Sequence, residues 1–289
     1  MERVTVTARR TAQVGLLAVL LALSGLVATA APTGAAELGA AQHPVQLALQ
    51  TVAVPSAVRA RGHDVSYPQC GRALPTSGDF GLVGVDGGLP FSANPCLAEQ
   101  IVWARTFGRP AYYANTANPG PRLSSHWPIG QHGPKACTKA RPDSEGCAYD
   151  YGVNAAKSSF ARARAAARSV GAKDPVASTW WLDVELHNTW EADEFGPAPK
   201  YLRNDVAALA GMVHALHRKG VRHVGVYSTA HQWGVVTGGA SLGRPPVWYA
   251  GTATLATART HCRPAFSFTG GPIRMAQYAT NGFDGDLRC

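Results

Sequence analysis

The sequence predicts an α/β fold, namely a TIM-like (β/α) barrel that forms a single domain over residues 61–289. Three amphipathic segments each end at a glycine and are followed by a short run of β-branched and aromatic residues, which is the pattern of repeated βαβ units. The length of about 230 residues is one that α/β barrels often fill as one domain. A doubly wound open sheet is the structural alternative.

The expected elements follow one another along the chain. The amphipathic segments, each closed by Gly108, Gly171 or Gly220, are residues 95–107, 155–170 and 201–219. The expected strands are residues 63–68, 81–88, 110–116, 176–185, 221–229, 247–251 and 273–279. An eighth strand, around residues 265–268, would close the barrel. Residues 116–150 contain five prolines and little periodicity, so we expect loops to replace some of the helices.

The N-terminal 60 residues are excluded from the folded domain. Residues 1–30 have a short basic region, an apolar run from Val14 to Val27 and a small-residue cleavage site, as signal peptides do. Residues 31–60 are rich in alanine without a sustained period and predict a flexible lead-in. We therefore expect a secreted, extracellular protein, associated with the cell wall and free of the membrane once the signal is removed. A retained N-terminal anchor is the alternative.

All six cysteines lie in the folded part of the chain, and an even number in an exported protein favours three disulfide bonds. The sequence leaves the pairing open. We expect sequence neighbours to pair, as 70–96, 137–147 and 262–289. Because no CxxC motif occurs and the Cys–His spacings fit no zinc signature, no metal site is expected.

The charge of the chain suggests an anionic polymer as its partner. The net charge is +9, and residues 61–289 retain 23 basic against 16 acidic side chains, a balance of +7, which suits binding to a cell wall. Nucleic acid is not the expected partner, because no dense Lys/Arg stripe alternates with aromatic residues. No nucleotide, flavin or phosphate-loop signature is present, so no organic cofactor is expected.

The stretch TWWLDVELHN, residues 179–188, places two acids on an otherwise apolar strand. Alternate side chains face opposite sides of a strand, so Trp181, Asp183 and Glu185 share one face. In a barrel this face is the interior, near the end where barrel enzymes place their chemistry. Burial and mutual repulsion should raise the pKa of one of the two carboxyls, and a protonated acid is what glycosidic bond cleavage requires. Structural acids paired with Arg or Lys are the alternative.

Other expected strands also carry polar or aromatic groups at or near their ends, where a sugar would bind. The acids among these groups are Asp64 and, in the C-terminal segment GFDGDLRC, Asp284 and Asp286. Asp86 precedes two glycines, so a role in a turn and a role in the binding site are equally good interpretations of this residue. Each aromatic residue has a core position as its alternative. The substrate-binding candidates are Asp86, Tyr113, Asn115, Trp181, Tyr227, Tyr249 and Gln277.

Three segments resemble glycoside hydrolase family 25, the secreted lysozymes that cut bacterial peptidoglycan. They are GHDVSYPQC (62–70), WWLDVE (180–185) and MAQYATNGFDGDLRC (275–289), in the family's order. The resemblance implies a TIM-like barrel and a muramidase-like hydrolysis of peptidoglycan. The strand-two pattern VGVDGGLPF, the six cysteines and the loop 116–150 differ from the family, which suggests a remote, actinobacterial-type member.

The resemblance also implies roles for four acids. Glu185 would be the general acid, and Asp183 would orient or stabilise the positively charged transition state or a substrate-assisted intermediate. Asp64 and Asp286 would complete the catalytic rim, with Asp284 in reserve for Asp286. The protein is expected to act as a monomer on a polysaccharide. A non-catalytic glycan-binding protein of the cell envelope, on a glycosidase-like barrel, is the alternative function.

Overall fold

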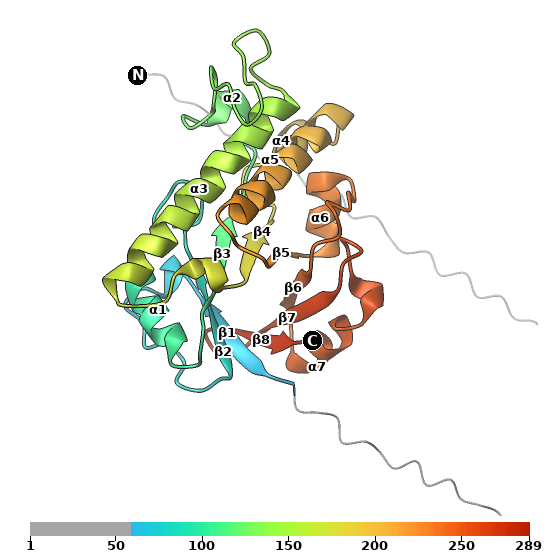
Figure 1. The fold of residues 1–289 in the computed structure, drawn as a ribbon. Coiled ribbons are helices and arrows are strands. Elements are labelled where there is room, and N and C mark those ends of the chain that lie inside the picture. The colour runs from blue at the N-terminus through green and yellow to red at the C-terminus, as the bar shows by residue number, and fades with distance from the viewer. Residues whose placement is uncertain (1–58) are drawn as a thin grey trace, which may run out of the picture. The chain divides into compact units, whose positions relative to one another are not determined.

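The computed structural model describes residues 59–289, which form a closed barrel of eight strands arranged in sequence order (Figure 1). Neighbouring strands are parallel from β1 to β7. The strands are β1 (Arg61–Val65), β2 (Phe80–Gly84), β3 (Ala111–Asn115), β4 (Trp180–Asp183), β5 (Val224–Ser228), β6 (Val247–Thr252), β7 (Ile273–Ala279) and β8 (Asp284–Arg288). The barrel prediction is confirmed, and the open-sheet alternative is wrong.

The eighth strand is not where the sequence suggested. Residues 264–266 form a short 3-10 helix, and the barrel is closed instead by β8, which runs antiparallel to both β7 and β1. A tight turn allows this reversal, since the Thr280 amide donates to the carbonyl of Phe283 over 3.1 Å. The short DGDLR segment carries three charges, so its composition does not indicate a strand.

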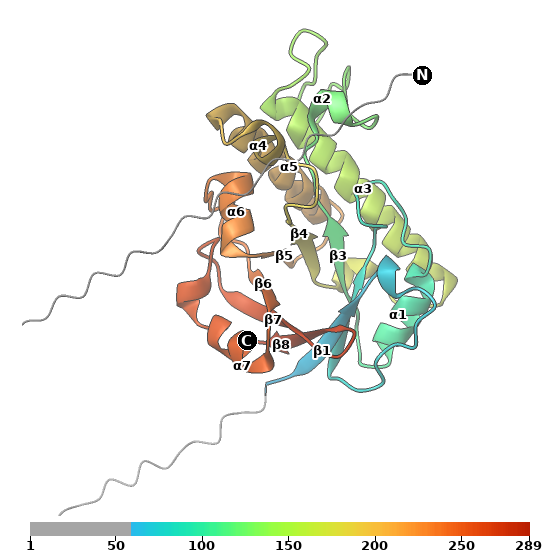
Figure 2. The ribbon, with the colours of Figure 1, turned by 180° about the vertical axis from the view of Figure 1, so that it is seen from behind.

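The long helices pack on the outside of one half of the barrel, where α3 and α5 lie side by side (Figures 1 and 2). The three expected helices are confirmed as α1, α3 and α5. The helix α3 begins ten residues earlier than expected, because the Ser144 side chain caps it by accepting from the Cys147 amide. The helices are α1 (Leu97–Arg105), α2 (Gly120–Leu123), α3 (Glu145–Ser169), α4 (Glu191–Phe195), α5 (Pro199–Arg218), α6 (Ala230–Thr237) and α7 (Leu255–His261).

Loops replace helices at two connections, as expected. In residues 59–289, β1 and β2 are joined by a 3-10 turn (Tyr67–Gln69) and a loop, and β7 and β8 by the turn at 280–283. The first residues after β1, which are Ser66, Tyr67 and Pro68, line the cavity described below.

The barrel interior is layered from apolar to polar. At the amino ends of the strands it is filled by a hydrophobic cluster of Phe80, Leu82, Trp181, Trp248 and Met275. Toward the carboxyl ends, inward positions of β1, β3, β4, β5 and β7 are polar. They include Asp64, Tyr113, Asn115, Asp183, Tyr227 and Gln277. The alternation of side chains along each strand therefore brings polar groups from several strands together over an apolar base.

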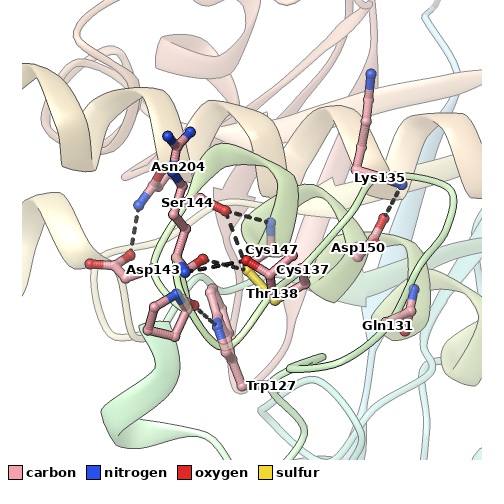
Figure 3. The surroundings of a disulfide bond; sticks show 12 residues. Trp127, Gln131, Lys135, Cys137, Thr138, Asp143, Ser144, Cys147, Asp150 and Asn204 are labelled. Carbon is pink, nitrogen blue, oxygen red and sulfur yellow. Dashed lines mark hydrogen bonds between the residues drawn. A yellow bond between two sulfur atoms is a disulfide. The ribbon is translucent and has the colours of Figure 1, made fainter.

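All three expected disulfide bonds are confirmed, as Cys70–Cys96, Cys137–Cys147 and Cys262–Cys289. The second one ties the loop before α3 to the first turn of that helix (Figure 3). Around it, the Trp127 indole donates to the carbonyl of Pro142 over 2.6 Å, and the Lys135 amide donates to Asp150 over 2.9 Å. The disulfide bond thus anchors a long loop that has little regular structure.

Two glycines set the distance between α3 and α5. A Cβ on Gly211 would lie 2.0 Å from the carbonyl oxygen of Tyr149, and one on Gly152 would lie 1.9 Å from that of Ala208. We expect Gly211→Ala to lower the free energy of unfolding by roughly 1–3 kcal/mol, the usual effect of overpacking. The exposed Gly234 of α6 has no atom within 4 Å of such a Cβ, so Gly234→Ala should instead add about 0.5–1 kcal/mol. Thermal unfolding of both variants tests this, and an unchanged Tm for Gly211→Ala would contradict the close contact.

The expected signal peptide and nearly all of the expected lead-in lie outside the described residues. Among residues 59–289, no helix is both long enough and apolar enough to cross a membrane.

Candidate active site

A cavity of about 210 Å³ opens at the carboxyl ends of the strands. Four carboxylates line it, and neither a lysine nor an arginine of the described residues does. It is lined by Asp64, Ser66, Tyr67, Pro68, Gly88, Tyr113, Asn115, Asp183, Glu185, His187, Tyr227, Trp248, Gln277 and Asp284. The acids that the sequence places on distant strands therefore meet in one place.

The Asp183–Glu185 pair stands at the end of β4. Asp183 is buried, and its Oδ2 accepts from the Asn115 side chain over 2.7 Å, while its Oδ1 has no hydrogen-bond partner among the described residues. Burial, reinforced by the charge of Glu185, raises the pKa of Asp183 well above its usual value. Glu185 lies two residues farther along, and the only ion pair it forms with a described residue is to His187, at 3.4 Å. Burial thus favours a protonated Asp183 in the resting site.

A hydrogen-bonded chain holds the acid on the opposite side of the barrel. The Gln277 amide donates to Asp64 over 3.1 Å, and its oxygen accepts from the Tyr227 hydroxyl over 2.9 Å. Burial raises the pKa of Asp64 to about 7, and the charge of Asp284 adds to this rise. Gln277 and Tyr227, both candidates from the sequence, therefore position Asp64 and also line the cavity.

The two closing acids occupy different depths. Asp284 pairs with Asp64 across β1 and β8 and lines the cavity. Asp286 pairs with Gly62, one layer deeper, where it is fully buried and accepts from the Trp248 indole over 2.8 Å. Burial and the neighbouring Asp64 raise the pKa of Asp286 well above its usual value. Asp286, which the sequence favoured, therefore lies beneath the cavity, and Asp284 lies in its wall.

Three other candidates lie outside the cavity. Asp86 is buried between β2 and α3, where it accepts from the Ser159 hydroxyl at 2.9 and 3.0 Å and from the Asn115 amide at 3.2 Å. Trp181 faces the interior, but in the apolar layer below. Tyr249 points outward, toward His261, with ring centroids 4.3 Å apart. Of the candidate binding residues, Tyr113, Asn115, Tyr227 and Gln277 line the cavity.

Several residues of the cavity were not identified from the sequence. Trp248 forms its floor, because β6 turns this ring inward and its neighbour Tyr249 outward. Tyr67 is 44% exposed at the rim. His187 belongs to the TWWLDVELHN stretch but was not among the candidates. The others are Ser66, Pro68 and Gly88. Among the described residues, no group of three or more His, Cys, Asp or Glu is arranged to hold a metal ion.

Buried acids should make the fold more stable in mild acid. Burial raises the pKa of Asp64, Asp86, Glu191 and Asp205 to about 7 in each case. The folded protein therefore keeps protons that the unfolded chain has released, so the free energy of unfolding falls as the pH rises from about 4 to about 7. We expect a lower Tm at pH 8 than at pH 5, measured by calorimetry at constant ionic strength. A higher Tm at pH 8 would show that these carboxyls are ionised in the folded state.

Comparisons with known proteins find similarity only among solved structures. No protein-family model matches the chain, and no curated protein matches it. One similar structure is a muramidase from Acremonium alcalophilum, at 16% identity over 80% of this chain and 94% of that chain, with a TM-score of 0.47. A family GH25 lysozyme from Aspergillus fumigatus has 15% identity, coverages of 80% and 93%, and a TM-score of 0.49. A bacterial lysozyme from Streptomyces coelicolor has 14% identity, coverages of 80% and 93%, and a TM-score of 0.42.

Proposed function

We propose that this chain is a secreted glycoside hydrolase that cleaves a cell-wall polysaccharide, peptidoglycan, by carboxylate acid catalysis. One observation supports this most directly: four carboxylates and three tyrosines surround a single cavity that no lysine or arginine of the described residues lines. Carboxylates can supply both the proton and the stabilising negative charge that glycosidic cleavage needs. The structural alternative for Glu185, a pairing with Arg or Lys, has no support in the geometry, because its partner is the exposed His187.

In the proposed reaction, Asp183 and Glu185 share a proton. Burial favours a protonated Asp183 in the resting site, and this proton would pass to Glu185 before it reaches the sugar. Glu185 is the more accessible of the two, with 22% of its side chain exposed, so Glu185 would donate to the glycosidic oxygen. Asp183 would then carry the negative charge that stabilises the positively charged sugar.

Asp64 and Asp284 form the opposite wall of the cavity. We assign them to the second half of the reaction, in which a water or a substrate group is oriented against the sugar. Asp286 is assigned a supporting role beneath Asp64, because it does not reach the cavity. The volume is below the roughly 300–1000 Å³ of drug-sized sites. This cavity therefore admits one sugar unit, and the rest of the polymer would lie across the rim.

The test is to incubate the purified protein with a panel of wall polymers and to identify the released fragments by mass. We expect fragments with new reducing ends from peptidoglycan, and none from the same polymer after the protein is heat-inactivated. Fragments from another polysaccharide would correct the substrate. Binding to the wall without any fragments would favour the non-catalytic glycan-binding alternative.

A further inference from the structure

A second cavity, of about 310 Å³, lies beside α4 and shares no lining residue with the proposed active site. It is lined by α2 and the residue before it, the loop before α3, and the helices α4 and α5. Its side chains include two acids, a guanidinium group and two aromatic rings. They belong to Arg122, Asp143, Glu191, Phe195 and Tyr201.

Glu191 presents one unsatisfied oxygen to this cavity. The residue is 2% exposed, and its Oε2 accepts from the Asn118 and Asn204 side chains over 3.1 and 2.8 Å. Its Oε1 accepts no hydrogen bond from any described residue and faces Gly120, whose Cβ, if present, would lie 2.5 Å away. This oxygen can therefore accept a hydrogen bond from a ligand.

Arg122 is the complementary free group on the same cavity. Its guanidinium lies 4.6 Å from the centroid of the Phe195 ring and forms no ion pair or hydrogen bond with a described residue. The neighbouring Asp143 is already neutralised, because Lys200 pairs with it and Asn204 donates to it over 2.9 Å (Figure 3). The cavity therefore offers one carboxyl oxygen without a donor, on Glu191, and one guanidinium group without an acceptor, on Arg122.

The rest of the wall is apolar and firmly held. The rings of Phe195 and Tyr201 pack with centroids 5.4 Å apart. The start of α4 is fixed because Asp205 accepts from the Ala192 amide over 3.0 Å. The Cys137–Cys147 disulfide anchors the loop that carries Asp143. The charged groups are therefore preorganised, which reduces the entropy lost on binding.

We propose that this cavity binds a zwitterionic amino-acid group, with its ammonium on Glu191 and its carboxylate on Arg122. A simple anion would meet the Glu191 carboxylate, and a simple cation would meet the Arg122 guanidinium. A neutral sugar would leave both charges without a partner. Arg binds carboxylates through paired hydrogen bonds, and an ammonium brings three donors. The inference rests on the proposed function in one respect: on a wall polymer, the ligand would be an amino-acid group of a peptide attached to the glycan, with its ammonium and its carboxylate both free.

The experiment measures binding of D-alanine to the full chain by saturation-transfer NMR, with N-acetyl-D-alanine and D-alaninamide as probes that each lack one charge. We expect D-alanine to bind and each one-charge probe to bind at least tenfold more weakly. Arg122→Leu should reduce D-alanine binding at least tenfold, and because Arg122 is exposed the variant should fold normally. Arg218→Leu, an exposed arginine on the last turn of α5, is the matched control and should bind as the wild type does.

Two outcomes would overturn the proposal. One is no binding of D-alanine by the wild type, and the other is equal binding of the three probes. Glu191→Gln gives a second measurement, since it keeps the oxygen but removes the charge, and it should weaken binding of D-alanine and of D-alaninamide alike. Turnover is not needed for any of these measurements. If the protein binds D-alanine but releases no sugar, the proposed hydrolase activity is rejected and this binding site is retained. If it releases sugar but does not bind D-alanine, the site is rejected and the hydrolase activity is retained.

Discussion

Glu185→Gln is expected to reduce the release of reducing ends from cell-wall glycan by roughly 10²–10⁴-fold, the range in which general acid catalysis contributes to rate. The substitution keeps the shape of the side chain but removes the carboxyl group that would pass the proton to the glycosidic oxygen. The other three acids of the cavity wall, Asp64, Asp183 and Asp284, are not altered by this substitution. The measurement is a reducing-sugar assay on purified wall, together with a pull-down on the same wall to show that binding persists.

The control for this prediction is Glu99→Gln. Glu99 is an exposed acid in the first turn of α1 and does not line the cavity, so this variant loses the same charge without touching the site. It should hydrolyse the wall at the wild-type rate. Equal rates for Glu185→Gln and the wild type would remove Glu185 from the catalytic role. A wild type that binds the wall without releasing sugar would instead favour the glycan-binding alternative.

The sequence predicted most of the barrel because periodic packing leaves a local signal. Apolar runs bounded by glycine marked seven strands, and amphipathic runs marked α1, α3 and α5. The eighth strand left no such signal, because β8 is held by its two neighbours and by burial of Leu287, not by its composition. The sequence predicts the eighth strand around residues 265–268, where the structure has an isolated 3-10 turn at 264–266.

The sequence predicted which strands carry the candidate site, but not how deep in the barrel each side chain lies. Alternation along a strand decides which face a residue shares with its neighbours, but not which face is inside. Trp248 and Tyr249 are adjacent aromatic residues, and only the pairing of β6 with β7 turns Trp248 inward. Asp284 and Asp286 share a face but differ by one layer, and only the register with β1 shows which of them reaches the cavity. Long-range register is not encoded in any short segment.

Asp183→Asn is expected to lower hydrolysis by about two to three orders of magnitude and, at the same time, to stabilise the fold at alkaline pH. The loss of activity follows from removing the negative charge that the transition state needs. The gain in stability follows from the raised pKa of Asp183, since burial penalises its ionised form and asparagine cannot ionise. The introduced asparagine can still accept from Asn115, the only described side chain that donates to the Asp183 carboxyl group. The NH₂ group of this asparagine would take the position of Oδ1, which has no hydrogen-bond partner among the described residues.

The pH dependence distinguishes this explanation from a generic effect of the substitution. A carboxyl with a raised folded pKa contributes its stability fully below its unfolded pKa of about 4 and loses it as the pH rises toward the folded value. The Tm difference between Asp183→Asn and the wild type should therefore grow from pH 5 to pH 8 in favour of the variant. Asp193→Asn, at an exposed acid of α4, should leave both activity and Tm unchanged. If Asp183→Asn loses activity but is less stable than the wild type at pH 8, Asp183 is ionised and paired in the resting site. The proton that Glu185 donates would then have to come from another group.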